Sequence, residues 1–402
     1  MERNVRVAIF SPFSLPEASA NALRVESFRK HFSGQGINVK VFSPLRDGFD
    51  MDEVPQGYYR YTGLLDASNI VFNGDFDLVL GTSPPLTHSF IAGLAGKLSG
   101  KKFIVDLRDP WTHAYQGLGI YSPFNPKLWA FKIMEALAYN LADNVFAATG
   151  ATAKIAAKKT LRKGKIVVVE NGSTPSVFRP DRAMGDATRK RLGIPKNAKV
   201  CIYAGAFAKK GVDELISETG KTMLGSGAYL LLVIPLSGTE QGERKTLEKA
   251  IMESVLKEKI RVVDSTGLPS ERMYEFYSAA DLGLDPLPKG MEDYCIPVKT
   301  YDFFSCGIPV IGKGAKGSEL EKIVAGNSLG WFAEDWKGFN AKLAIALKGA
   351  ELGKMGSRAR ELSQKRFDRK FANEKALAKI RGLLENTNRQ RGSRKNEGKK
   401  PG

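Results

Sequence analysis

The chain has 402 residues, of which 43% are hydrophobic, and a formal net charge of +18. This length favours two globular domains over one, and the longest clean apolar run, residues 228–234, is too short to span a bilayer. The three cysteines and three histidines are scattered, which excludes a disulfide framework and a zinc site of clustered ligands.

The first half of the chain alternates short apolar runs with stretches of helical spacing. This alternation is typical of βαβ units that build a parallel, doubly wound sheet. We expect strands at residues 5–10, 39–42, 77–80, 102–107, 145–148 and 166–169. We expect helices at residues 20–32, 86–98, 128–141 and 152–161.

A turn cluster at residues 171–176 predicts a linker, after which the same alternation restarts. We expect strands at residues 198–204, 229–234, 260–263, 282–285 and 308–310. We expect helices at residues 212–223, 245–256, 271–279, 318–325 and 336–348, and a long helical stretch at 358–384. The sequence therefore predicts two Rossmann-like α/β domains and a long C-terminal helix.

These patterns give domain boundaries. We expect a first domain at residues 1–172, a second at 173–352, and a terminal helix at 353–385 that returns to the first domain. Residues 386–402 hold six basic residues and one acid without apolar side chains, so they predict a disordered tail.

The basic charge indicates a polyanionic partner. The sequence holds no nucleic-acid-binding motif, so solvated basic faces and an anionic membrane surface are the alternatives that stay open. The helix at 128–139 carries Lys127 and Lys132 beside Trp129 and Phe131, a composition that suits either a membrane interface or a core stripe. Residues 3–10 predict a strand and not a signal peptide, so we expect the cytoplasm, with peripheral contact at the inner face of the membrane.

Two common nucleotide-binding motifs are absent from the sequence. A dinucleotide-binding glycine motif would follow the first strand, where residues 11–16 have none. No P-loop motif occurs anywhere in the chain. The pair Asp75 and Asp77 matches an Asp-x-Asp metal motif but opens a predicted buried strand, so we predict no metal site there.

A phosphate cradle is predicted at residues 296–310. Pro297 and Lys299 stand at the start of a short helix, Asp302 lies within it, and Gly307 ends it. A helix start offers free backbone N–H groups to a phosphate, and a carboxylate can accept hydrogen bonds from a ribose. Gly205 and Lys210 form a second such loop, before the helix at 212–223. Together they suggest a sugar-nucleotide site.

These segments, taken in order, resemble the family-4 retaining glycosyltransferases of the GT-B fold, in the subgroup that builds surface and lipid-linked glycans. The resemblance covers roughly residues 5–350. It rests on the strand ending in Ser-Pro-Pro at 76–85, the Asp-Leu-Arg-Asp-Pro-Trp segment at 106–111, the Asn-Gly linker at 169–172, and the segments 204–211, 279–284 and 296–310.

The resemblance implies roles for individual residues. On the donor side, Lys210 would neutralise the departing diphosphate, Asp302 would accept the ribose hydroxyls, and the donor would also contact Gly205, Gly267, Leu268, Pro297, Val298, Lys299 and Thr300. On the acceptor side, the loop would include Ser14, Ser19 and Asn21, with Arg24 behind it. Asp106, Arg108 and Asp109 would lie near the reacting carbon, in a cleft between the domains.

The implied activity is transfer of a sugar from a nucleoside diphosphate sugar to a glycan or lipid-linked acceptor, with retention, with no metal and with no cofactor beyond the donor. The chain departs from the family pattern where Ala206 and Phe207 replace a usual arginine, and where Asp302 replaces a usual glutamate. A nucleotide-sugar epimerase and a non-catalytic sugar-nucleotide-binding protein are the alternatives.

Overall fold

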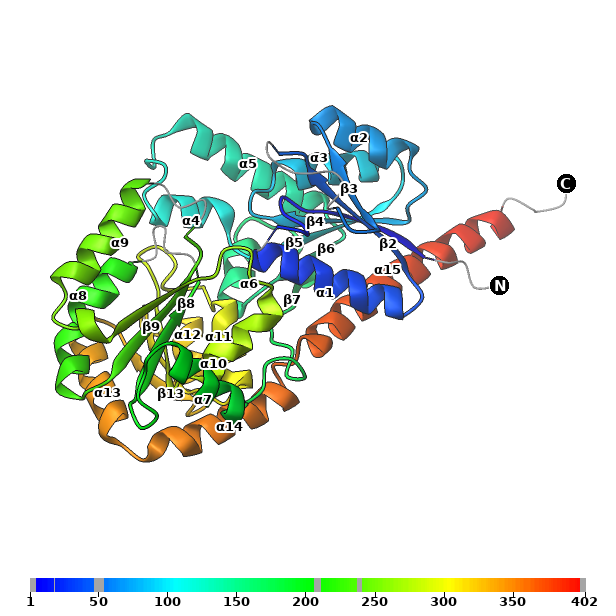
Figure 1. Cartoon of the computed structure of the whole chain (residues 1–402). Helices are drawn as coiled ribbons and strands as arrows, with labels where there is room; N and C mark the ends of the chain where they lie inside the picture. Colours follow the sequence, from blue (N-terminus) through cyan, green and yellow to red (C-terminus); the bar gives the residue numbers. More distant parts are fainter. Residues whose placement is uncertain (1–4, 18, 47–53, 206–210, 237–240, 398–402) are drawn as a thin grey trace, which may run out of the picture. The chain divides into compact units, whose positions relative to one another are not determined.

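The computed structural model describes residues 5–17, 19–46, 54–205, 211–236 and 241–397, with side chains in the last helix described to residue 385. The chain divides into two compact units (Figure 1). The first unit is Met1–Glu170 with Arg369–Gly402, and the second is Asn171–Asp368. Each unit is a parallel sheet covered by helices, so the predicted fold of two Rossmann-like domains is confirmed.

Within its described residues, the first unit holds a seven-stranded parallel sheet in the order β3-β2-β1-β4-β5-β6-β7. Its strands are β1 (Arg6–Phe10), β2 (Asn38–Pro44), β3 (Tyr58–Tyr61), β4 (Leu78–Ser83), β5 (Lys102–Leu107), β6 (Asn144–Ala147) and β7 (Ile166–Val168). Its helices are α1 (Ala20–Gly34), α2 (Leu64–Asn73), α3 (Thr87–Leu98), α4 (Trp111–Gly117), α5 (Pro126–Leu141), α6 (Gly150–Ala157) and α15 (Arg369–Glu397), with the 3₁₀ turn η2 (Lys163–Lys165).

Side-chain alternation in β5 shows how this sheet separates its two cores. Phe103, Val105 and Leu107 pack in the core on one face. Ile104 packs in the opposite core, which also contains residues of α1 and α15. Because successive strand residues face opposite sides, Asp106 shares the face of Ile104 and is directed toward α1.

The described part of the second unit holds a six-stranded parallel sheet in the order β10-β9-β8-β11-β12-β13. Its strands are β8 (Val200–Ala204), β9 (Tyr229–Ile234), β10 (Ile260–Asp264), β11 (Leu282–Pro286), β12 (Val310–Lys313) and β13 (Gly330–Ala333). Its helices are α7 (Arg182–Arg191), α8 (Val212–Gly225), α9 (Gln241–Glu253), α10 (Met273–Ser278), α11 (Val298–Ser305), α12 (Glu319–Val324), α13 (Trp336–Lys348) and α14 (Glu351–Lys365), with η3 (Lys257–Lys259) and η4 (Ser270–Arg272).

Close packing of α11 on β11 depends on one glycine. A Cβ atom at Gly283 would lie 2.6 Å from the ring of Phe303. The absence of that atom lets α11 approach the strand. This approach brings the first turn of α11 to the end of β11.

The C-terminal region differs from the predicted single helical stretch. Two helices occupy it: α14 belongs to the second unit, and α15 belongs to the first unit, where it packs along α1 (Figure 1). Residues 386–397 continue α15, where the composition predicted a disordered tail. Extending an existing helix costs far less free energy than nucleating a new one. Residues 386–397 also contain no proline, which would end the helix.

Candidate functional site

Each sheet has a point where the strand order reverses. In the first unit this switch point lies between β1 and β4, and in the second between β8 and β11. Doubly wound sheets bind ligands beyond the carboxyl ends of their strands at such points. Residues after β1 and β8, and the helix that follows β11, are therefore in the positions where ligand-binding residues are expected.

Arg24 and Asp106 form a buried ion pair in the first unit. The Nε and Nη2 atoms of Arg24 lie 2.9 Å and 2.7 Å from the two carboxylate oxygens of Asp106. Arg24 also donates to the carbonyl oxygens of Val169 and Glu170 at 2.9 Å and 3.1 Å. The pair therefore ties α1 to β5 and to the chain that follows β7.

Asp106 lies in the protein interior. The residue is 0% exposed and its carboxylate is engaged by Arg24. Together with Arg24, Asp106 therefore supports the segment that follows β5. Its predicted place near the reacting carbon stays a prediction.

Arg108 and Asp109 lie in that segment and are both partly exposed. The Arg108 amide donates to the Ser83 carbonyl oxygen at 3.2 Å, which joins the ends of β5 and β4. These two residues remain the candidates for substrate contact after β5.

The sequence analysis missed a buried carboxylate that holds α4 next to this segment. Glu135, 0% exposed, accepts hydrogen bonds from the Thr112 amide at 3.1 Å and hydroxyl at 2.5 Å. It also contacts the ammonium group of Lys159. The sequence alone did not single out Glu135, because its partners Thr112 and Lys159 are distant in sequence.

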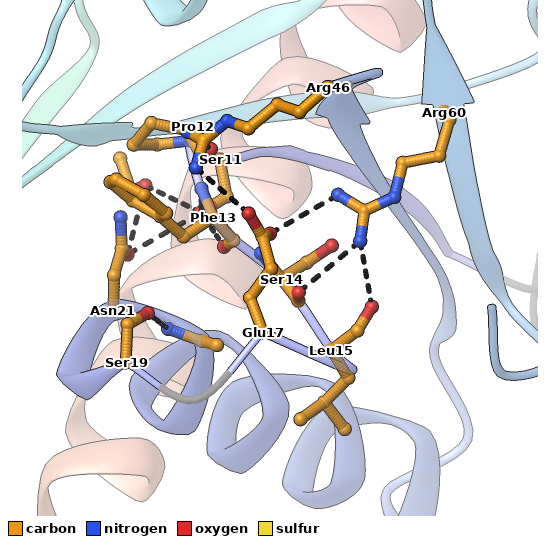
Figure 2. A network of polar contacts seen from close by, with 12 residues as sticks. Ser11, Pro12, Phe13, Ser14, Leu15, Glu17, Ser19, Asn21, Arg46 and Arg60 are labelled. Atoms are coloured by element: carbon orange, nitrogen blue, oxygen red, sulfur yellow. Dashed lines mark hydrogen bonds and ion pairs between the residues drawn. The ribbon is translucent and has the colours of Figure 1, made fainter. Parts of the chain in front are cut away.

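The predicted acceptor loop after β1 is held by a second acidic residue that sequence reasoning missed, Glu17 (Figure 2). Its carboxylate accepts from the Ser14 amide at 2.7 Å and pairs with Arg46 at 2.9 Å and Arg60 at 3.3 Å. The two arginines also donate to the loop carbonyls of Pro12 at 2.6 Å and Leu15 at 3.0 Å. Side chains from β3 and from the chain after β2 therefore hold this loop.

Ser19 and Asn21 are placed at the start of α1. Ser19 Oγ accepts from the Ala22 amide at 3.0 Å, so it is the N-cap of the helix. Asn21 Oδ1 lies 3.4 Å from the hydroxyls of Ser11 and Thr82, which join β1 and β4 to α1. Within the described part of the chain, Asn21 Nδ2 and Ser14 Oγ are buried without a hydrogen-bond partner. Two polar groups at this switch point are thus available to a ligand or to water.

In the second unit, Gly205 follows β8 with φ +122°, a backbone conformation that favours glycine. It is exposed. Lys210, predicted to face the diphosphate, lies outside the described residues. Gly211 has φ +66° and begins the first turn of α8.

Lys299 contacts the ends of both strands at the second switch point. Its ammonium lies 3.3 Å from Asp285 of β11 and 3.7 Å from the ring centroid of Tyr203 in β8. Asp285 is 1% exposed and also accepts from the Thr300 hydroxyl. Burial lowers the pKa of Lys299, and the nearby Asp285 carboxylate opposes that shift.

Asp285 is the main residue at the second switch point that sequence reasoning missed. It appeared only as the last residue of a predicted strand. Its importance depends on the packing of α11 against β11, which no local pattern shows. The sequence signal that could have found it is an acid at the end of a buried run, beside the proline Pro286.

The carboxylate of Asp302 is directed to another side chain of the same unit. It is 7% exposed, and its Oδ1 accepts from Ser173 Oγ at 2.6 Å. The predicted contact of Asp302 with a ribose stays a prediction. Gly267, with φ +67°, and Leu268 form a turn after β10, two strands from β8 in the sheet. Pro297 precedes α11 in an extended conformation, and no side chain caps the helix.

Among the described residues, no group of three or more His, Cys, Asp or Glu side chains could hold a metal ion. In the same residues, no helix combines the length and hydropathy needed to cross a membrane. Asp75 and Asp77, of the Asp-x-Asp pair, both contact Arg6.

Comparisons with known proteins agree with this architecture. Residues 22–176 match the model of Glycosyltransferase Family 4. No curated protein matches the sequence.

Similar solved structures include sucrose-phosphate synthase from Thermosynechococcus elongatus, with 18% identity and a TM-score of 0.76 over 95% of this chain and 99% of that chain. HepE from Anabaena in complex with UDP-glucose has 16% identity and a TM-score of 0.71 over 94% of this chain and 100% of that chain. A glycosyltransferase from Rickettsia africae has 16% identity and a TM-score of 0.71 over 96% of this chain and 100% of that chain. Residues 22–176 thus match Glycosyltransferase Family 4, and the chain shares the two-domain GT-B fold of these structures.

Proposed function

We propose that the protein moves a sugar from a nucleoside diphosphate sugar to a glycan or lipid-linked acceptor, with retention and without a metal ion. The donor binds at the switch point of the second unit. The observation that carries this proposal is the uncapped start of α11 beside the Lys299–Asp285 pair. Free amides at a helix start favour a phosphate group.

The donor half of the reaction needs stabilisation of negative charge. When the bond between the sugar anomeric carbon and the phosphate oxygen breaks, charge develops on the diphosphate. The backbone N–H groups of residues 298 and 299 and the Lys210 ammonium stabilise that charge without reorganising, whereas the Thr300 amide donates to the Pro297 carbonyl oxygen at 3.1 Å. Because HepE, one of the similar structures, was determined with UDP-glucose, UDP-sugars are the first donors to test.

The acceptor half is assigned to the loop after β1 and to Arg108 and Asp109. The Asn21 Nδ2 and Ser14 Oγ groups, which lack partners among the described residues, suit a ligand rich in hydroxyl or phosphate oxygens. In the retaining reaction, the acceptor oxygen attacks the face from which the diphosphate leaves. Its proton passes to the departing phosphate oxygen, and no protein base is required.

A transfer assay tests this proposal. The protein is incubated with radiolabelled nucleotide sugars and a lipid extract or oligosaccharide panel, and label is followed into product. We expect transfer that persists in EDTA and a product with the anomeric configuration of the donor. Lys299→Ala and Lys210→Ala should each lower kcat about 10²–10³-fold.

Lys322→Ala, which removes an exposed lysine paired with Glu319, is the matched control and should act as wild type. Thermal unfolding checks that Lys299→Ala is folded. An epimerised donor without transfer would contradict the proposal in favour of an epimerase. Donor binding without turnover under all acceptors would contradict it in favour of a binding protein.

A further inference from the structure

One face of α5 carries large apolar side chains that the protein leaves in solvent. Trp129, Ile133 and Leu137 are 55%, 59% and 50% exposed. They stand four residues apart, so they line one face of the helix. The opposite face, with Leu128, is buried in the unit's core.

Two loop residues extend this face at both ends of α5. Phe124, 90% exposed, precedes the helix, and the Trp129 indole donates to the adjacent Pro123 carbonyl at 3.0 Å. Leu161, also 90% exposed, is tied to the end of the helix because its amide donates to Asn140 Oδ1 at 2.9 Å. We name the set Phe124, Trp129, Ile133, Leu137 and Leu161 the α5 apolar ridge.

The structure corrects the residues that sequence suggested for this face. Phe131 was grouped with Trp129 as an interfacial aromatic. It instead packs on Trp111, with ring centroids 4.3 Å apart, at the edge of the core. Ile133 and Leu137 take its place beside Trp129 on the exposed face.

The exposed charged side chains between residues 121 and 165, which include the α5 apolar ridge, are all basic. Lys132 lies 4.9 Å from the centre of the Trp129 ring, and Lys127 is exposed one turn earlier. Arg162 and Lys163 are exposed directly after Leu161. Between residues 121 and 165 the sequence has two acids, Glu135 and Asp143, and both are paired: Glu135 with Lys159, and Asp143 with Lys97 and Lys102.

We propose that the α5 apolar ridge docks on an anionic membrane surface, with α5 lying in the plane of the interface. Its apolar side chains enter the boundary between head groups and acyl chains, and the flanking lysines and arginine meet the lipid phosphates. A second copy of this chain fits less well, because two basic faces on a protein of net charge +18 repel. The proposal does not depend on the donor or on the reaction.

Vesicle binding of the full chain tests the proposal. Vesicles of phosphatidylcholine with phosphatidylglycerol are compared with phosphatidylcholine alone, by co-sedimentation. We expect binding to the anionic vesicles that weakens with added salt. The variant carrying Trp129→Gln, Ile133→Gln and Leu137→Gln should lose this binding. Lys127→Gln and Lys132→Gln should each weaken it roughly five-fold.

Leu65→Gln is the matched control, because Leu65 is 82% exposed on α2 of the same unit, and it should bind as wild type. Brominated lipids should quench tryptophan fluorescence in wild type but not in Trp129→Phe. Wild type that ignores anionic vesicles, or a triple variant that binds as well as wild type, would overturn the proposal. So would a dimer of the wild-type chain that the triple variant abolishes while vesicle binding is unchanged. Transfer to a soluble acceptor is measured in parallel, so that failure of the proposed function is seen separately.

Discussion

The two switch points hold their charges in different ways. In the first unit, guanidinium groups clamp carboxylates: Arg24 on Asp106, and Arg46 and Arg60 on Glu17. In the second unit, Lys299 pairs with Asp285, and the neighbouring hydrogen-bond donors are backbone amides at the start of α11. An arginine guanidinium can donate two hydrogen bonds in a fixed geometry, whereas a lysine ammonium acts as a point charge. Side chains therefore shape the first site, and helix packing shapes the second.

The Arg24–Asp106 pair gives the largest expected effect. Asp106→Ala leaves a buried guanidinium without its anion and should lower the free energy of unfolding by about 3–5 kcal/mol. Chemical denaturation measures it. Asp109→Ala, at a partly exposed position, should stay within about 0.5 kcal/mol of wild type. Equal effects of the two variants would show that Asp106 is not a structural anchor.

Loss of Glu17 should cost less, because more than one residue holds the loop. Glu17→Gln removes two ion pairs and weakens the bond to the Ser14 amide. We expect a loss of about 1–3 kcal/mol in unfolding free energy and faster proteolysis within the loop after β1. Asp75→Asn, which changes an exposed partner of Arg6, is the control. An unaltered loop in Glu17→Gln would contradict this account.

Lys299 should make the free energy of unfolding depend on pH. Because burial lowers the pKa of Lys299 below 10.5, the unfolded chain binds this proton more tightly than the folded chain. The contribution of Lys299 to the free energy of unfolding therefore rises with pH, from the lowered pKa of Lys299 in the folded protein up to about 10.5. In Lys299→Met that rise should disappear. Denaturation of both proteins across this window measures it, and a constant difference between them would contradict the assignment.

The smallest expected effect concerns the cap of α1. Ser19→Ala removes the hydroxyl that accepts a hydrogen bond from the Ala22 amide. The substitution should lower the free energy of unfolding by about 1 kcal/mol. Ser19→Asp keeps an acceptor at the same place and should remain near wild type. Thermal unfolding distinguishes them, and equal losses would show that the hydroxyl does not cap the helix.

Local patterns predicted much of the fold but less of the site. The strands at 102–107 and 229–234 and the helix at 336–348 were predicted with the bounds observed, since each is a clear apolar pattern with sharp ends. Strands β3 and β13 were missed, because four-residue edge strands leave little periodicity.

The site depends on contacts that sequence distance hides. Pro297 marked the start of α11 correctly, since it stands directly before the first helical residue. The pairing of Arg24 with Asp106 joins residues 82 positions apart, and that of Lys299 with Asp285 requires the glycine at 283. The Asp302 contact with Ser173 spans 129 positions. Whether the two switch points act on one substrate stays a prediction.

The proposed function requires the second unit to bind a nucleoside diphosphate at the start of α11. Hydrogen exchange with mass spectrometry, with and without UDP, GDP or ADP, measures this binding. We expect one of these nucleotides to slow exchange of the amides at residues 298–300, while the amides of β5 and β6 in the first unit are unchanged. Unaltered exchange at 298–300 with a nucleotide that binds elsewhere would contradict it.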